Sequence, residues 1–246
     1  PPRPTRTPGI GLVSQSGALG MALLQAAARG VEFSHMVAPG NACDVDVADL
    51  IGYLAEDAHC AVIACVFEGT SSPARLLQAG ALARQRRKPV LVCKIASGEE
   101  GAAAAMSHTG SVAGSEAAWQ ALFERAGFIV VEHFDALVET ASFFRKAPAH
   151  RGNGAAVISP SGGAGILCAD AAERWGVPLP QPSEPATALL RSVVPEFGAA
   201  RNPCDVTAQV INDAGSLARC AGALLGDAGV GALVVPHITA YAEATQ

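Results

Sequence analysis

Short apolar runs alternate with Ala-rich, amphipathic segments along most of this 246-residue chain. The apolar runs are rich in Val, Ile and Leu without polar alternation, which is typical of parallel strands buried on both faces. Gly, Pro and Ser mark where the intervening helices begin and end. In the first part of the chain we expect strands at 9–14, 33–38, 61–67, 89–94 and 128–131, and helices at 17–29, 47–54, 73–86, 115–126 and 135–144.

This alternation stops at a stretch rich in Pro, Gly and charge and then begins again, with AAVISPSGGAG repeating the order of GLVSQSGALG. Strand and helix in alternation predict right-handed crossovers and parallel sheets. We therefore expect an α/β chain with two flavodoxin-like, succinyl-CoA synthetase-like domains at 9–145 and 155–246, and linkers at 1–8 and 146–154. The second domain has too few strands for a complete doubly wound sheet, so we expect it to be truncated.

Composition excludes several classes of partner. The net charge is −5, and the one basic cluster, at 84–88, ends a predicted helix, so no nucleic-acid partner is expected. The 7 Cys residues form no C-x-x-C pair and no metal-ligand spacing, which favours reduced, buried thiols in a cytoplasmic protein without a metal site. No apolar run approaches the length of a membrane span, so no membrane partner is expected.

Candidate chemistry begins with the stretch ASGEEGAAAAMSHTGSVAGS, which runs from Ala96 to Ser115. Its side chains are too small to bury much apolar area, so we expect a mobile surface loop. The loop carries one imidazole, that of His108. A mobile loop with one reactive side chain indicates a carrier, although a solvated surface histidine is the alternative interpretation.

Two Gly/Ser turns favour the carrier. VSQSGALG at 13–20 and ISPSGGAGIL at 158–167 each follow an apolar strand and open an Ala-rich helix. Unpaired amides and the positive end of the helix dipole make such a turn a seat for an anion. Tight packing of strand against helix is the alternative role of these glycines. The candidate phosphate-binding residues are Ser14, Gln15, Ser16, Gly17, Ser161, Gly162 and Gly163.

Glu68 directly follows the predicted strand at 61–67. The carboxyl ends of parallel strands gather at one edge of a sheet, where Glu68 would be able to reach the histidine. A carboxylate bonded to one ring nitrogen raises the nucleophilicity of the other nitrogen. A solvated acid or a helix-cap partner is the alternative. A serine hydrolase is disfavoured because neither turn has the G-x-S-x-G pattern, and a dinucleotide site because the first turn lacks G-x-G-x-x-G.

These segments together resemble the NDP-forming (ADP-forming) acyl-CoA synthetases, relatives of succinyl-CoA synthetase and ATP-citrate lyase. The similar segments cover nearly the whole chain from Gly9 onward, and SHTGSVAG following KPVLVCK is a specific signature. The other matching segments are GLVSQSGALG, GNACDVDVADLIGYLAED, FEGT, ISPSGGAGILCADAAERWGVPLP and NPCDVT.

The resemblance implies an acid-CoA ligase that exchanges acyl-CoA, phosphate and NDP for carboxylic acid, CoA and NTP. In that family an acyl phosphate forms and its phosphoryl group passes to a loop histidine, which carries it to a nucleotide. Carried over, His108 is the phosphohistidine and Glu68 the acid that supports it. The SQSG and SPSGG turns then correspond to the helix N-termini between which the phosphohistidine is held.

The family's CoA-binding domain and its ATP-grasp domain, which binds nucleotide and Mg²⁺, have no counterpart in this sequence. The resemblance therefore implies that CoA, ATP or ADP and Mg²⁺ act as substrates bound largely by domains of the same or another chain. It implies no permanent cofactor, an inactive fragment when alone, and an oligomer. A non-catalytic sensor region of a protein acetyltransferase is the alternative, and a purely structural role is a third possibility.

Overall fold

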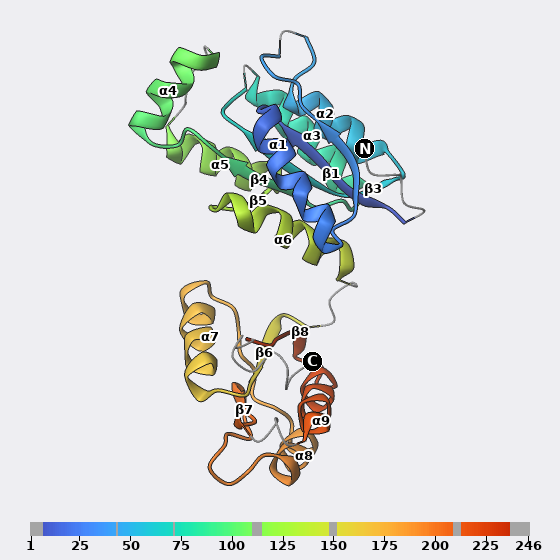
Figure 1. The fold of residues 1–246 in the computed structure, drawn as a ribbon, viewed down its shortest axis with the longest axis vertical. Coiled ribbons are helices and arrows are strands. Elements are labelled where there is room, and N and C mark those ends of the chain that lie inside the picture. The colour runs from blue at the N-terminus through green and yellow to red at the C-terminus, as the bar shows by residue number, and fades with distance from the viewer. Residues whose placement is uncertain are drawn as a thin grey trace. The chain divides into compact units, whose positions relative to one another are not determined.

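The computed structural model describes residues 7–42, 44–70, 72–109, 115–147, 152–208 and 213–236, with the side chains of residues 107–109 and 214 left aside. The chain divides into two compact units, Pro1–Ala147 and Pro148–Gln246 (Figure 1). In each unit the strands pair in parallel and helices connect them. The predicted α/β class with parallel sheets is confirmed.

The first unit is built on a five-stranded sheet with the order β2-β1-β3-β4-β5. This order is the flavodoxin-like arrangement, in which the order of strand addition across the sheet reverses between β1 and β3. All pairs are parallel, so every strand ends at the same edge. The strands are β1 (Gly9–Ser14), β2 (Phe33–Val37), β3 (Cys60–Phe67), β4 (Val90–Lys94) and β5 (Ile129–Val130).

Alternating strand residues supply two cores, one on each face of this sheet. Ile63 and Cys65 of β3 pack in one cluster with α2, α3 and α5, whereas Val62 and Ala64 pack in the other with α1 and α6. Successive side chains of a strand point to opposite faces, which explains the division. The helices are α1 (Gly17–Leu24), continued by the 3-10 helix η1 (Gln25–Arg29), α2 (Val47–Glu56), α3 (Pro73–Gln85), α5 (Glu116–Ala126) and α6 (Phe134–Lys146).

The expected surface loop at 96–115 is wrong over most of its length, because Glu99–Thr109 forms a helix, α4. Ala has the most favourable helix propensity, and Glu99 and Glu100 in the first turn complement the helix dipole. A segment with little apolar area therefore becomes helical without a large packed face. Residues 110–114 of the predicted loop lie outside the described residues.

The second unit has a three-stranded parallel sheet with the order β7-β6-β8. Asn202 connects this sheet to the segment before α8: its side chain accepts a hydrogen bond from Val157 N at 2.9 Å and donates to Ala155 O at 2.8 Å and Pro180 O at 3.0 Å. The short strand β7 lies within NPCDVT, where we expected only a turn. The elements are β6 (Gly154–Ser159), α7 (Gly162–Arg174), α8 (Glu184–Val193), β7 (Cys204–Asp205), α9 (Ala214–Leu225) and β8 (Val230–Val234).

The described cysteines are unpaired and most are buried. Cys60, Cys65, Cys93, Cys204 and Cys220 are buried, and Cys168 is partly exposed. Burial raises the pKa of the Cys93 and Cys65 thiols above the ordinary value, so both stay protonated near neutral pH. Across the described ranges, no helix combines the length and the apolar character needed to cross a membrane.

Two helical glycines provide a test of how tightly the first unit is packed. A methyl group on Gly80 of α3 would meet the carbonyl oxygen of Ala126, whereas one on Gly52 of α2 would meet nothing within 4 Å. We expect Gly80→Ala to lower the free energy of unfolding by about 1–3 kcal/mol through overpacking. Gly52→Ala should raise it by about 0.5–1 kcal/mol through helix propensity. Urea unfolding followed by circular dichroism measures both, and equal effects would contradict the packing.

Candidate functional site

The SQSG turn connects β1 to α1 at the carboxyl edge of the first sheet. Ser16 is the N-cap of α1, and its hydroxyl accepts a hydrogen bond from Leu19 N at 3.3 Å. Ser14 is fully buried and donates its hydroxyl hydrogen to Ser16 O at 2.6 Å. Gly17 is exposed, and a methyl group there would meet no atom of the described residues within 4 Å. The start of α1 is therefore accessible, with a rigid turn behind it.

Glu68 lies beside this turn because β1 and β3 are neighbours, with Ser14 opposite Val66. The side-chain amide of Gln15 spans the two segments. Its Oε1 accepts hydrogen bonds from Glu68 N at 2.6 Å and Gly69 N at 3.5 Å, and its Nε2 donates to Gly69 O at 3.2 Å. Glu68 itself is partly buried. The structure thus brings Gln15 and Glu68, two of the predicted site residues, together.

The far end of the loop after β3 is also fixed. Thr70 donates its hydroxyl hydrogen to Asp46 Oδ2 at 3.1 Å, and Asp46 is the N-cap of α2. Arg75 of α3 forms an ion pair with Asp49 in the first turn of α2. The loop that begins with Glu68 is therefore held at its first residues by Gln15 and at Thr70 by Asp46.

Lys94, which sequence analysis missed, lies at the end of β4 opposite Phe67. Its Nζ donates to Ile95 O at 2.6 Å and Ala96 O at 3.3 Å and lies 5.2 Å from the centre of the Trp119 ring. Burial lowers the pKa of Lys94, while the carboxylates of Glu116 and Glu68 act in the opposite direction. Its position at the end of the apolar run PVLVCK is the signal that marks it.

His108 lies in the last turn of α4, and its side chain is outside the described part of the structure. Figure 1 shows α4 standing apart from the other helices of this unit, and among its described side chains only Ala105 is buried. The chain enters α4 from β4 through Ala96, which has a positive φ of 58°. The candidate phosphohistidine is thus carried on a helix that follows the strand end where Lys94 lies.

The SPSGG turn in the second unit has a different environment. Ser161 is the N-cap of α7, and its amide donates to the hydroxyl of the buried Ser159 at 3.0 Å. The Asp205 carboxylate lies at the start of this helix, with Oδ2 2.8 Å from where a Cβ on Gly162 would be. Its Oδ1 accepts from Thr207 N at 2.9 Å. The predicted anion seat formed by Ser161, Gly162 and Gly163 therefore faces a carboxylate, which sequence analysis also missed.

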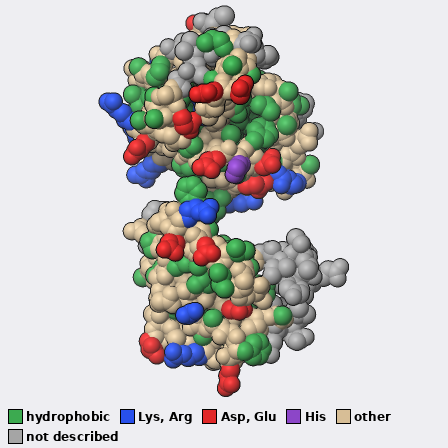
Figure 2. All heavy atoms as spheres, turned by 90° about the vertical axis from the view of Figure 1, so that its left-hand side faces the viewer, with side chains coloured by type: hydrophobic (Ala, Val, Ile, Leu, Met, Phe, Trp, Pro, Cys, Tyr) green, Lys and Arg blue, Asp and Glu red, His purple; other side chains and the backbone are tan. Residues whose placement is uncertain are grey.

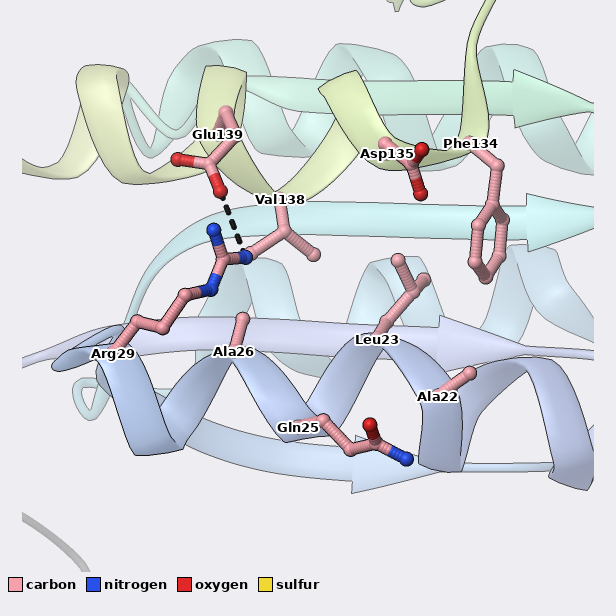
Figure 3. Close-up of a pocket in the computed structure, with 9 residues that line it drawn as sticks. All are labelled: Ala22, Leu23, Gln25, Ala26, Arg29, Phe134, Asp135, Val138 and Glu139. Carbon is pink, nitrogen blue, oxygen red and sulfur yellow. Dashed lines mark ion pairs between the residues drawn. The ribbon is translucent and has the colours of Figure 1, made fainter. Parts of the chain in front are cut away.

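A cavity of about 690 Å³ lies between α1–η1 and α6 of the first unit (Figure 3). Its floor includes the buried side chains of Leu23, Ala26 and Val138. An exposed ion pair between Arg29 and Glu139, at 2.9 Å, spans the end that lies toward the amino ends of the strands. Among the described residues, no Ser, Thr, Cys, His or Lys lines it, and none of the predicted site residues does, so we do not assign the chemistry to it.

Charged side chains of both signs are interspersed on the one face of the molecule that Figure 2 shows. On the face in Figure 2, Lys and Arg are scattered among acidic residues, and no large basic patch forms there. Within those same ranges, no group of three or more His, Cys, Asp or Glu is arranged to hold a metal ion. The groups described at the candidate site are backbone amides, hydroxyls and the charged side chains of Glu68 and Lys94.

Comparison with known proteins identifies the family. The family model described as the succinyl-CoA ligase like flavodoxin domain matches residues 7–144. The alpha subunit of ADP-forming acetate–CoA ligase II from Pyrococcus furiosus is 35% identical over 81% of this chain. The chain belongs to the succinyl-CoA ligase-like family. The resemblance to NDP-forming acyl-CoA synthetases that we inferred from the sequence is thereby confirmed.

Members of the succinyl-CoA ligase-like family that resemble this chain are longer. The chain covers 43% of the Pyrococcus furiosus subunit and 28% of ADP-forming acetate–CoA ligase I from Archaeoglobus fulgidus, which is 36% identical over 80% of this chain. The structure of acetyl-coenzyme A synthetase 1 from Ca. Korarchaeum cryptofilum, in complex with phosphate and ADP, is 28% identical with a TM-score of 0.82. That likeness covers 95% of this chain and 50% of that one.

The carboxylate at the α7 start predicts a measurable difference in anion binding. We expect Asp205→Asn in this succinyl-CoA ligase-like chain to tighten binding of inorganic phosphate at the Gly162 and Gly163 amides roughly fivefold, because a repelling charge is removed. Phosphate titration followed by amide chemical shifts measures the change. Asp227→Asn is the matched control, since Asp227 accepts from Ser183 N, the N-cap of another helix. Unchanged affinity in Asp205→Asn would contradict the prediction.

Proposed function

We propose that this chain is the phosphoryl-carrying part of an NDP-forming acyl-CoA synthetase. The reaction exchanges acyl-CoA, phosphate and NDP for a carboxylic acid, CoA and NTP, with His108 as the phosphohistidine. The observation that carries the proposal is the fixed position of Glu68 beside the accessible start of α1, in a chain of this family. The relatives named as ADP-forming acetate–CoA ligases support the reaction class.

The chemistry divides into three transfers. Phosphate attacks the thioester carbonyl of acyl-CoA, the C–S bond breaks, and CoA leaves as the thiolate. The acyl phosphate is the product. A ring nitrogen of His108 then attacks the phosphorus, the bond to the acyl oxygen breaks, and the carboxylate leaves with that electron pair. Finally a terminal oxygen of NDP takes the phosphoryl group from the imidazole. In-line geometry and neutralisation of the moving charge govern both phosphoryl transfers.

The predicted site residues other than Gln15 have the following roles. Glu68 accepts a hydrogen bond from the His108 ring and stabilises the positive charge that develops when its other nitrogen attacks. The α1 start, with Ser16 and Gly17 at its first turn, binds the phosphoryl oxygens. Ser14 keeps the turn in shape through its hydrogen bond to Ser16 O. Ser161, Gly162 and Gly163 form a second station, at which Asp205 weakens the hold on an anion.

We propose that other domains complete the enzyme. A CoA-binding domain and an ATP-grasp domain with Mg²⁺, in the same chain or in a partner chain, supply CoA and the nucleotide within an oligomer in the cytoplasm. The greater length of the relatives supports this arrangement, and the compact units at 1–147 and 148–246 are the two domains of this part. The sensor alternative is disfavoured, since the relatives described above are ligases and a synthetase.

The phosphohistidine is tested by labelling. Incubation of the chain, together with the CoA-binding and ATP-grasp domains proposed above, with ³²P-labelled acetyl phosphate should give a label that is lost in acid and stable in base, because the phosphoramidate bond has that behaviour. We expect His108→Asn to abolish it. His133→Asn is the matched control, because His133 is an exposed histidine of the same unit. Label that survives in His108→Asn would contradict the assignment of His108 as the phosphohistidine.

The role of Glu68 is tested by its amide variant. Glu68→Gln keeps the size of the side chain but removes the charge that stabilises the imidazolium, so we expect the labelling rate of His108 to fall roughly 10- to 100-fold. Rapid-quench measurement of label incorporation gives the rate. Glu132→Gln is the control, since Glu132 is an exposed acid just beyond β5. A Glu68→Gln rate equal to that of the unchanged chain would exclude Glu68 from the reaction.

A further inference from the structure

We propose that Gln15 is a positioning residue that sets the place of Glu68 relative to the anion seat at the start of α1. This inference rests on the function proposed above and deepens it. It differs from the phosphate-binding role that the sequence predicts for Gln15. The reason is that both polar atoms of its side-chain amide are engaged with the loop after β3.

The side-chain amide of Gln15 matches the hydrogen-bond donors and acceptors of the loop after β3. The Glu68 and Gly69 amides need an acceptor, and the Gly69 carbonyl needs a donor. A carboxamide offers an acceptor and a donor in one plane, and only one orientation of that amide fits. Turning it over would place its NH₂ against two N–H groups and its oxygen against a carbonyl. The contact is therefore chemically specific.

Gln15 holds the backbone of Glu68 and Gly69 at the start of this loop. The peptide unit between Glu68 and Gly69 is bounded on one side by the Cα of Gly69. Glycine has wide conformational freedom, so this unit is the easiest in the loop to reorient. Gln15 holds the Glu68 amide at 2.6 Å and the Gly69 carbonyl at 3.2 Å, one on each side of the Gly69 amide. Thr70 is fixed separately by Asp46. Gln15 therefore fixes the backbone on both sides of this unit at the start of the loop, beside the Glu68 side chain.

Gln15 also connects the end of β1 to β3 and to the start of α1. Its backbone amide donates to Val66 O at 3.0 Å, so it extends the pairing of β1 with β3 by one residue. The next residue, Ser16, is the N-cap of α1. A single residue thus joins the strand end, the helix start and the acid loop. Its side-chain hydrogen bonds therefore fix the backbone of Glu68 relative to the start of α1.

The first test compares labelling rates. Gln15→Leu retains the volume but makes no hydrogen bond, and we expect it to slow labelling of His108 by acetyl phosphate about tenfold. Gln25→Leu is the matched control, because Gln25 is an exposed glutamine at the start of η1 in the same unit, and its rate should not change. A Gln15→Leu rate equal to that of the unchanged chain, with Glu68→Gln slow, would overturn the inference while leaving the proposed function intact.

A double-mutant cycle separates positioning from direct contact with the phosphoryl group. If Gln15 acts through Glu68, adding Gln15→Leu to Glu68→Gln should slow labelling less than about twofold further. A full tenfold additional loss in the double variant would mean that Gln15 acts independently of the acid. That result would overturn the positioning role and favour phosphate binding instead.

Hydrogen exchange tests the contact without any chemistry. In the unphosphorylated chain we expect the Glu68 and Gly69 amides to exchange about tenfold faster in Gln15→Leu, because their acceptor is gone. Gln15→Glu serves as a second variant should Leu disturb folding. It keeps an oxygen that can accept from the Glu68 and Gly69 amides but loses the donor to Gly69 O, so exchange should accelerate less than in Gln15→Leu. Unchanged exchange in both variants overturns the inference.

The exchange measurement also distinguishes the two failures. If the unchanged chain takes no label in the presence of those domains, the proposed phosphohistidine fails, and the positioning of the Glu68 backbone by Gln15 is then decided by exchange alone. If the unchanged chain is labelled and exchange responds to Gln15 while the cycle is additive, the proposed function stands and the inference fails.

Discussion

Parallel pairing of β1 with β3 is the constraint on which the first unit depends. It places Ser14 opposite Val66, so that residues about 50 positions apart in the chain leave the sheet side by side. The Gln15 amide then joins the two departing segments through hydrogen bonds to Glu68 and Gly69. Because each backbone group at this edge has lost its strand partner, a side chain that satisfies several of them also determines the shape of the loop.

The two Gly/Ser turns share a sequence pattern but differ in what lies at their helix starts. At α1, Gly17 and Ala18 are exposed, and no atom of the described part of the chain lies within 4 Å of where a Cβ on Gly17 would be. At α7 the Asp205 carboxylate already lies against Gly162 and complements the helix dipole. The same local motif is therefore an open anion seat in one unit and a seat beside a negative charge in the other. The difference comes from NPCDVT, a segment far from the turn in sequence.

The α4 segment illustrates a limit of reasoning from burial. A stretch dominated by Ala and Gly contributes little to a core, and only Ala105 of its described side chains is buried. Helix formation does not require burial when the residues have high intrinsic propensity and a favourable charge in the first turn. Lys94 and Ala96 shape the corner from which α4 departs, through the hydrogen bonds of Lys94 Nζ to Ile95 O and Ala96 O. The candidate carrier is thus a helix joined to a well-ordered strand end.

The sequence by itself determined the α/β class, the family, and the strands and helices of the first unit apart from α4. Apolar runs and helical periodicity are local properties, and motif segments such as SHTGSVAG can be recognised from the sequence alone. It also singled out Glu68 and both turns, because residues after parallel strands must share one edge. Only the tertiary structure decided that Gln15 contacts the Glu68 loop, that Lys94 lies beside that loop, and that Asp205 faces α7. These contacts join segments distant in the chain, and side-chain hydrogen bonding between them depends on strand order and register, which no local pattern encodes.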